Sequence, residues 1–122
     1  PIMAGTTGKS RYLEAIRLGK AVSLRDGSPI TIQCEAKTAS QWLPSVTLSP
    51  SQPCGTTGQS KALEALKLSL SPTDAARYDI YYNTHLSWVG WQGWKKNGEV
   101  AGDRPSSHVE AVMIKLIEKS TE

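Results

Sequence analysis

The sequence predicts an all-β domain made of short-strand internal repeats, with a pseudo-threefold architecture of the β-trefoil or β-prism kind. The first observation behind this prediction is a repeated phrase. Residues 5–18 recur with few changes at 55–68, and a divergent third copy occupies 102–114. Each copy carries one glutamate, and the glutamates follow at nearly equal intervals, as in structural repeats. Units of this kind remove open sheet edges by closing on one another.

The second observation is the alternation of apolar and polar residues after each glycine loop. Leucines alternate with lysine and serine over 66–70, and Val112, Ile114 and Leu116 alternate with Met113 and Lys115. Residues 63–70 also fit the apolar face of a helix. The β-branched residues of the third copy favour a strand, because one slot of a repeat has one structure in all copies.

We expect the whole chain, 1–122, to form a single domain. It divides into a partial repeat (1–18), a divergent repeat (19–70), a full repeat (71–117) and a tail (118–122). The incomplete first repeat leaves a gap. Three segments are candidates to fill it: the C-terminal strand, a strand exchanged with another copy of the chain in a homo-oligomer, or sequence outside this chain.

The second repeat opens with a hairpin signal, because Asp26-Gly27 separates alternating apolar residues within 22–32. The proline- and serine-rich stretch 49–53 indicates a surface loop. In the third repeat, 71–77 is expected to form a turn or a short helical turn. Residues 78–86 are expected to form an aromatic-rich strand, and Asn97-Gly98 to form a second tight turn.

Charge and composition exclude several classes of partner and cofactor. The net charge is only +3, from 14 basic and 11 acidic residues, and the basic residues are scattered, so nucleic acid is not expected as a partner. No apolar stretch approaches the length of a membrane span, so membrane insertion is not expected. The two cysteines have no histidine beside them, so neither a metal nor another cofactor is expected.

Cys34 and Cys54 leave two interpretations open. A disulfide that closes a loop of this size would stabilise the fold by roughly 3 kcal/mol. Alternatively, both are buried free thiols, since Cys54 occupies the slot that holds Ala4 and Ala101 in the other copies.

Residues 78–102 carry a resemblance to a known family. They contain Tyr-Asp-Ile-Tyr-Tyr, His85, Gly90-Trp91, Trp94, Asn97-Gly98 and Ala101-Gly102, followed by the strand with its glutamate. This string resembles the ChW repeat, the clostridial hydrophobic repeat with a conserved tryptophan, and the Gly-Thr-Thr-Gly phrases are similar to the loop of that family. The resemblance extends over nearly the whole chain. It implies a secreted or bacterial cell-surface protein, with binding or adhesion roles and no established catalytic residues.

The sequence departs from the family's pattern in two places. The middle repeat keeps one tryptophan, Trp42, which aligns with Trp91, but it has no counterpart of His85 or Trp94. The last repeat lacks the Thr-Thr-Gly of the loop.

Three tryptophans, Trp88, Trp91 and Trp94, lie within seven residues and form the densest chemical feature of the chain. They suggest a platform for sugar rings. The groups that would complete such a ligand-binding site are Tyr81, Tyr82, Asn83, His85 and Glu99. The alternative is that the indoles belong to the core. The core is the preferred interpretation for Trp91, because Trp42 fills the same slot, whereas Trp88 has no counterpart and is the better candidate for exposure.

The recurring glutamates are either ligand carboxylates or scaffold residues. We expect a structural role in which each accepts backbone N–H groups from the glycine loop just before it, because a scaffold device recurs in every unit. The residues assigned to the scaffold are Glu14, Glu64, Glu110, Trp42, Gly5, Gly55 and Gly102.

No enzyme is expected. The phrase Gly5 to Ser10 resembles a phosphate-binding loop, but Met3 stands where that loop requires its first glycine, and Gln59 replaces the lysine in the second copy. Ser10 and Ser60 have no base at a suggestive spacing. The leading hypothesis is therefore a non-enzymatic surface module for polysaccharide or cell-wall glycan. The alternatives are a protein–protein adhesion or assembly module, and the targeting domain of a larger wall-active enzyme.

Overall fold

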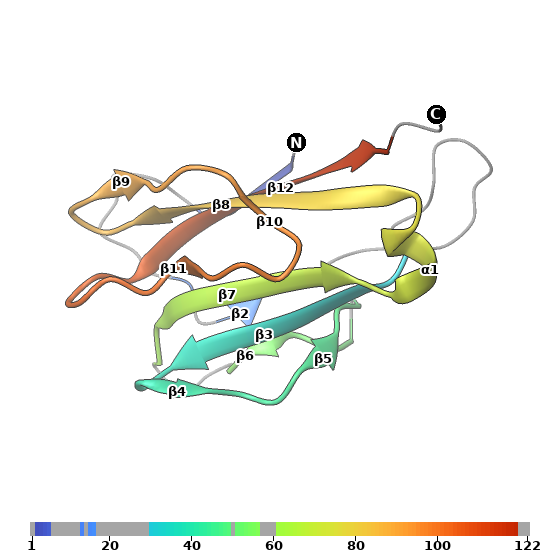
Figure 1. Ribbon diagram of the computed structural model, residues 1–122. Helices are drawn as coiled ribbons and strands as arrows, with labels where there is room; N and C mark the ends of the chain where they lie inside the picture. Colours follow the sequence, from blue (N-terminus) through green and yellow to red (C-terminus); the bar gives the residue numbers. More distant parts are fainter. Residues whose placement is uncertain are drawn as a thin grey trace.

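The computed structural model describes residues 2–5 (backbone only), 13, 15–16, 30–49, 51–56 and 61–119. The elements are β1 (Ile2–Gly5), β2 (Ala15–Ile16), β3 (Ile32–Thr38), β4 (Gln41–Trp42), β5 (Val46–Thr47), β6 (Cys54–Gly55), β7 (Leu63–Leu70), α1 (Pro72–Ala75), β8 (Tyr78–Leu86), β9 (Gly90–Trp91), β10 (Lys95–Lys96), β11 (Ala101–Gly102) and β12 (Val109–Glu118) (Figure 1). The all-β prediction is confirmed, and so are the strands expected after two glycine loops and at 78–86. The short helical turn is α1.

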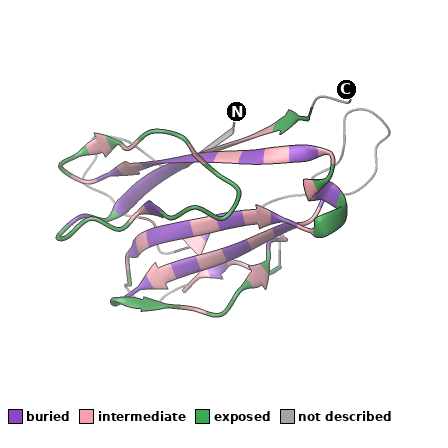
Figure 2. Ribbon diagram, in the orientation of Figure 1, coloured by how far each residue is buried: buried purple, intermediate pink, exposed green. Residues whose placement is uncertain are grey.

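Among the residues that the structure describes, all strand pairs are antiparallel, and they form three small sheets. One sheet has the order β1-β12-β8, with β9 and β10 on the other side of β8; a second has the order β11-β7-β3, with β4 and β5 beside β3; β2 and β6 form the third. Burial alternates along the long strands (Figure 2). The inward residues of both larger sheets, such as Leu66 and Ile80, belong to one hydrophobic core.

The two larger repeats follow the same plan. Each has a long strand that pairs with the last strand of its own repeat, β3 with β7 and β8 with β12. Each long strand also carries a two-residue strand with a tryptophan. Trp42 pairs with Lys37, and Trp91 pairs with His85. The register therefore agrees with the alignment of the two tryptophans.

The glycines of the repeated phrase pair in a cyclic order. Gly55 pairs with Ala15 of the repeat before it, Gly102 pairs with Ala65, and Gly5 pairs with Ala111 of the last repeat. Two backbone hydrogen bonds join equivalent residues of the three copies at the start of these strands, from Leu13 N–H to Val109 (2.8 Å) and from Leu63 N–H to Leu13 (2.6 Å). The C-terminal strand β12 thus lies beside the incomplete first repeat.

Gly102 shows why a glycine is needed at this position. Its φ is +91°, and a Cβ there would lie 2.9 Å from the carbonyl oxygen of Glu64 and 3.4 Å from the Cα of Ala65. Both the backbone conformation and the close approach of the neighbouring strand exclude a side chain without rearrangement.

The tight turn predicted at Asn97-Gly98 is confirmed, with φ values of +44° and +86° and a bond from Glu99 N–H to the Lys96 carbonyl. This turn joins the two larger sheets. Asn97 N–H donates to Ile80 in β8, and Gly98 N–H donates to Leu68 in β7.

The open question of the cysteines is settled in favour of the disulfide. Cys34 in β3 and Cys54 in β6 are bonded, with their Cα atoms 6.1 Å apart. The register places Tyr82 and Ala101 at the equivalent positions of the last repeat. There, a large and a small side chain fill the core where the second repeat has two cysteines.

Several predictions concern residues outside those that the structure describes. They are the hairpin around Asp26-Gly27, the loop residues 6–10, Glu14 and Ser60. Within the described part of the chain, no helix has the length and apolarity of a membrane span.

Candidate functional site

The candidate site is the outward face of the sheet formed by β8, β9, β10 and β12. Along β8, Ile80, Tyr82, Thr84 and Leu86 are buried on the core side, and the alternate residues Tyr81, Asn83 and His85 point to the other side of the sheet. Cross-strand pairing brings further side chains to that side, Trp91 beside His85 and both Lys96 and Lys115 beside Tyr81. We call this surface the aromatic face; its members are Tyr81, His85, Trp91, Trp94, Lys96 and Lys115.

Trp88 stands apart from the other tryptophans. It lies at the tip of the β8–β9 turn, where 92% of its surface is exposed, and its φ is +68°. A bulky residue rarely adopts this backbone conformation. Three residues lie between the paired Leu86 and Gly90, whereas two lie between the equivalent pair of β3 and β4. The prediction that Trp88 is exposed is confirmed.

The tip is anchored on both sides of Trp88. Ser87 N–H donates to the carbonyl of His108, and the Ser107 hydroxyl donates to the carbonyl of Ser87 at 3.1 Å. Val89 N–H donates to Leu86. The backbone around the exposed indole is therefore held by hydrogen bonds, although the side chain itself projects into solvent.

The interpretation of Trp91 as a core residue is wrong, because 38% of its surface is exposed. Its strand has two residues and pairs at the edge of β8, so its ring covers the outside of the sheet. The ring stacks edge-on against His85, with centroids 5.1 Å apart. His85 Nδ1 lies 3.0 Å from Oε1 of Glu110, which is 4% exposed.

Trp94 and Tyr81 hold lysine side chains against their rings. The Nζ of Lys115 lies 4.2 Å from the centroid of Trp94 and 5.6 Å from that of Tyr81. The Nζ of Lys96 lies 5.9 Å from the centroid of Tyr81. These distances are those of cation–π contacts.

Two predicted ligand groups are unavailable at the surface. Tyr82 is fully buried, its hydroxyl donates to the carbonyl of Glu99, and burial raises the pKa of its phenol. Asn83 is buried as well, and its Oδ1 accepts from Gly93 N–H at 3.0 Å. Neither side chain is therefore exposed to a ligand in this structure, because Tyr82 faces the core and Asn83 holds the loop before Trp94.

Glu99 remains exposed, but its carboxylate already has a partner. Its Oε1 accepts the backbone N–H of Lys96 at 2.7 Å, which closes the turn. The carboxylate therefore lies beside β10 and carries a negative charge close to the aromatic face.

The partners expected for the glutamates are different from those observed. The Oε1 of Glu64 accepts from Ser40 N–H at 2.9 Å, in the turn between β3 and β4. Glu110 contacts His85 rather than its preceding loop. In the second repeat, Lys37 occupies the position equivalent to His85. A hydrogen bond from Lys37 to Asp103 at 2.8 Å raises the pKa of Lys37, and the charge of Glu64 adds to this effect. Glu64 and Glu110, the two glutamates of the repeated phrase that the structure describes, thus both lie near the end of a long strand and near the basic residue there, Lys37 or His85.

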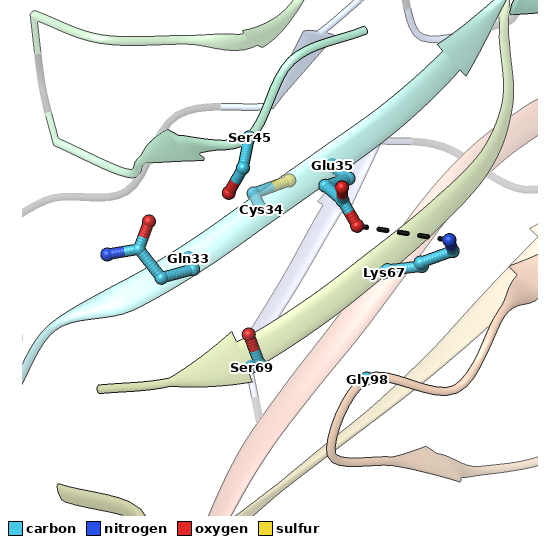
Figure 3. A pocket seen from close by; sticks show the side chains of 7 residues that line it. All are labelled: Gln33, Cys34, Glu35, Ser45, Lys67, Ser69 and Gly98. Atoms are coloured by element: carbon cyan, nitrogen blue, oxygen red, sulfur yellow. Dashed lines mark ion pairs between the residues drawn. The ribbon is translucent and has the colours of Figure 1, made fainter. Parts of the chain in front are cut away.

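The second repeat has a smaller version of the aromatic face. Trp42 is 36% exposed, and the Nζ of Lys67 lies 4.4 Å from its ring centroid. A shallow hollow of about 60 Å³ lies nearby, with the Glu35–Lys67 ion pair (3.9 Å) among its lining groups (Figure 3). This is far smaller than the roughly 300–1,000 Å³ of small-molecule sites. The described residues also contain no cluster of three potential metal ligands.

Sequence reasoning missed the lysines of both faces. Lys96 lies in β10, before the Asn97-Gly98 turn, and Lys115 lies in β12, well after it. Both lie beside Tyr81 only because of the register in which β10 and β12 pair with β8. The alternation of apolar and polar residues over 112–116 places Lys115 on the polar side of its strand, and this pattern could have predicted its position on the aromatic face.

A family model described as Clostridial hydrophobic W matches residues 42–72. The match begins at Trp42 and includes β5, β6 and β7, so it covers the later part of the second repeat and the two residues that follow it. It confirms the resemblance to the ChW family. No curated protein and no solved structure matches the chain.

Proposed function

We propose that the chain is a non-enzymatic binding module of a secreted or cell-surface bacterial protein, and that it recognises polysaccharide or cell-wall glycan. The observation that carries the proposal is Trp88, whose exposed indole sits at an anchored hairpin tip in an unfavourable backbone conformation. Full burial of a large apolar side chain stabilises a fold by about 1.5–3 kcal/mol, and this residue forgoes that gain. A ligand that covers the indole would recover it.

The family match supports the cellular setting, since ChW repeats occur in clostridial surface proteins. The disulfide supports it independently, because disulfides persist in oxidising environments outside the cytoplasm. Both cysteines are consumed in that bond, so the chain has no free thiol to act as a nucleophile.

The cyclic register supports the finer architectural proposal. We propose that the three repeats are related by a pseudo-threefold axis, in a closed arrangement of the trefoil or prism kind. Each glycine strand pairs with the preceding repeat, and β1 joins the first repeat to the last. A closed ring would present equivalent tryptophan faces in successive repeats.

The experiment that tests the function is binding of the purified chain to a panel of wall and environmental polysaccharides, by glycan array and titration calorimetry. Trp88→Ala is the test variant, and Trp42→Ala is the matched control, because it removes an exposed indole from the other repeat. We expect Trp88→Ala to abolish binding while its melting temperature stays unchanged. Absence of binding across a broad panel, or equal loss in both variants, would contradict the proposal.

A protein–protein module is the second candidate, and the exposure of Val89 (45%) beside Trp88 favours it. Aliphatic side chains offer no stacking surface to sugars, but they fit an apolar protein interface. If this is the function, Trp88→Ala would reduce self-association, or capture of a protein partner, in sedimentation experiments. Neither the variant nor the unmodified chain would bind polysaccharide.

A further inference from the structure

We propose that the aromatic face binds an anionic group, a phosphate or a carboxylate carried by a polysaccharide, between Lys96 and Lys115 over the ring of Tyr81. This inference rests on the proposed function and specifies the chemistry of its ligand. Its basis is two ammonium groups that cross-strand pairing brings to one aromatic ring.

The two lysines come from the strands on either side of Tyr81. Lys96 in β10 and Lys115 in β12 both pair with Tyr81 in β8, and the three strands lie side by side in the upper sheet of Figure 1. Their Nζ atoms lie 5.9 and 5.6 Å from the centroid of the Tyr81 ring. One ring therefore has a positive charge on each side.

Neither ammonium has a carboxylate within ion-pairing distance among the residues that the structure describes. The nearby acidic groups have other partners. Glu99 accepts the backbone N–H of Lys96, and Asp79 accepts from Asn97 and lies 3.7 Å from Lys119. The hydrogen bond from Asn97 and, after it, the charges of Lys119 and Lys96 lower the pKa of Asp79, so Glu99 and Asp79 are both negative charges near the proposed site. The face thus keeps two positive charges that internal ion pairs do not neutralise.

The aromatic rings prepare these lysines for binding. A lysine on the surface loses side-chain entropy when it binds an anion, and this loss weakens the interaction. Here, contact with Tyr81 and Trp94 already restricts the side chain of Lys115 before any ligand binds, so less side-chain entropy is lost when an anion binds. The remaining N–H donors can form charge-assisted hydrogen bonds to phosphate or carboxylate oxygens.

The exposed part of Trp94 completes the site for a sugar rather than for a free ion. Its indole is 39% exposed beside Lys115, so a sugar ring attached to the anionic group can rest on it. This geometry favours a polymer in which each anionic group is joined to a sugar or polyol.

The test measures binding of the full chain to four polymers: poly(glycerol phosphate), polygalacturonate, neutral dextran and an oligothymidylate. The variants are Lys96→Gln, Lys115→Gln and the double variant. Lys67→Gln is the matched control, because it removes the same charge from a lysine stacked on Trp42 in the other repeat. Melting curves check that all variants fold.

We expect each single variant to weaken binding to an anionic polymer about tenfold, as for loss of one charge-assisted hydrogen bond, and the double variant to weaken it further. Lys67→Gln should bind like the unmodified chain. Preference for the first polymer would identify the anion as phosphate, and preference for the second would identify it as carboxylate.

Three results would overturn the inference: equal loss in Lys67→Gln, unchanged affinity in the double variant, or tighter binding of an oligothymidylate than of either anionic polymer. Neutral glycans that bind through Trp88 while the anionic polymers do not would also overturn it and leave the proposed function standing. Absence of all carbohydrate binding would contradict both.

Discussion

Gly102→Ala tests whether close approach of neighbouring repeats fixes the repeated glycine. The substitution has two costs. A residue other than glycine at φ +91° is strained by about 1–3 kcal/mol. The new Cβ would also lie 2.9 Å from a carbonyl oxygen of β7, and overpacking of this kind costs about 1–3 kcal/mol more. We therefore expect the free energy of unfolding to fall by roughly 2–6 kcal/mol.

Gly93→Ala is the matched control. Gly93 has a φ of +99°, and a Cβ there would meet nothing within 4 Å, so only the backbone strain remains. Urea denaturation, followed by intrinsic fluorescence, gives both free energies. The difference between the two variants should be about 1–3 kcal/mol. If Gly102→Ala is no more destabilising than Gly93→Ala, the close approach of the strands does not explain the repeated glycine.

Three further predictions concern stability. Cys34→Ala/Cys54→Ala should lower the free energy of unfolding by about 3 kcal/mol, since the bond closes a loop with a sequence separation of 20. Under reducing conditions the bond is absent from both proteins. If the double variant is then destabilised by the same amount, loss of the disulfide is not the cause. Asp79→Asn should flatten the acid limb of the stability curve. The hydrogen bond from Asn97 lowers the pKa of Asp79, so its contribution is present above the unfolded pKa, about 3.9, and is lost as the pH falls through the folded pKa; an unchanged acid limb would refute it. Trp88→Gly should raise the free energy of unfolding by up to about 1 kcal/mol, because glycine adopts a φ of +68° without strain; destabilisation in a thermal melt would contradict the assignment of strain.

The regular strands could be predicted from the sequence because their signal is local and repeated. Alternation over 66–70 and 112–116 identified the last strand of each larger repeat, and Asn97-Gly98 identified a turn whose φ values only such residues adopt easily. The ambiguity between helix and strand was resolved by comparing copies. Comparison of the repeated copies therefore decided between helix and strand, which the propensity of a single copy could not do.

The environment of the tryptophans could not be predicted in the same way. The shared slot of Trp42 and Trp91 predicts burial only if a recurring residue must belong to the core, but recurrence shows only that both residues have the same environment. That environment is the outside of a sheet edge, next to Lys37 in one repeat and His85 in the other. Which face an edge strand presents depends on tertiary pairing.

The partners of the glutamates depended on contacts between distant segments. Glu64 bonds to Ser40, and Glu110 contacts His85, each from a neighbouring strand or turn. The disulfide was likewise undetermined, because sequence separation does not give the distance between Cα atoms. Such pairings become visible only when register is known.

The comparison of the two hairpins strengthens the functional interpretation of Trp88. The β3–β4 turn reverses the chain with Ala39 and Ser40 at positive φ, and it needs no large side chain. The β8–β9 turn is one residue longer and places an indole at its tip. Because the same fold forms without that residue in the second repeat, the scaffold does not require Trp88. Its exposure and its strained backbone therefore support the proposal that Trp88 contacts a ligand.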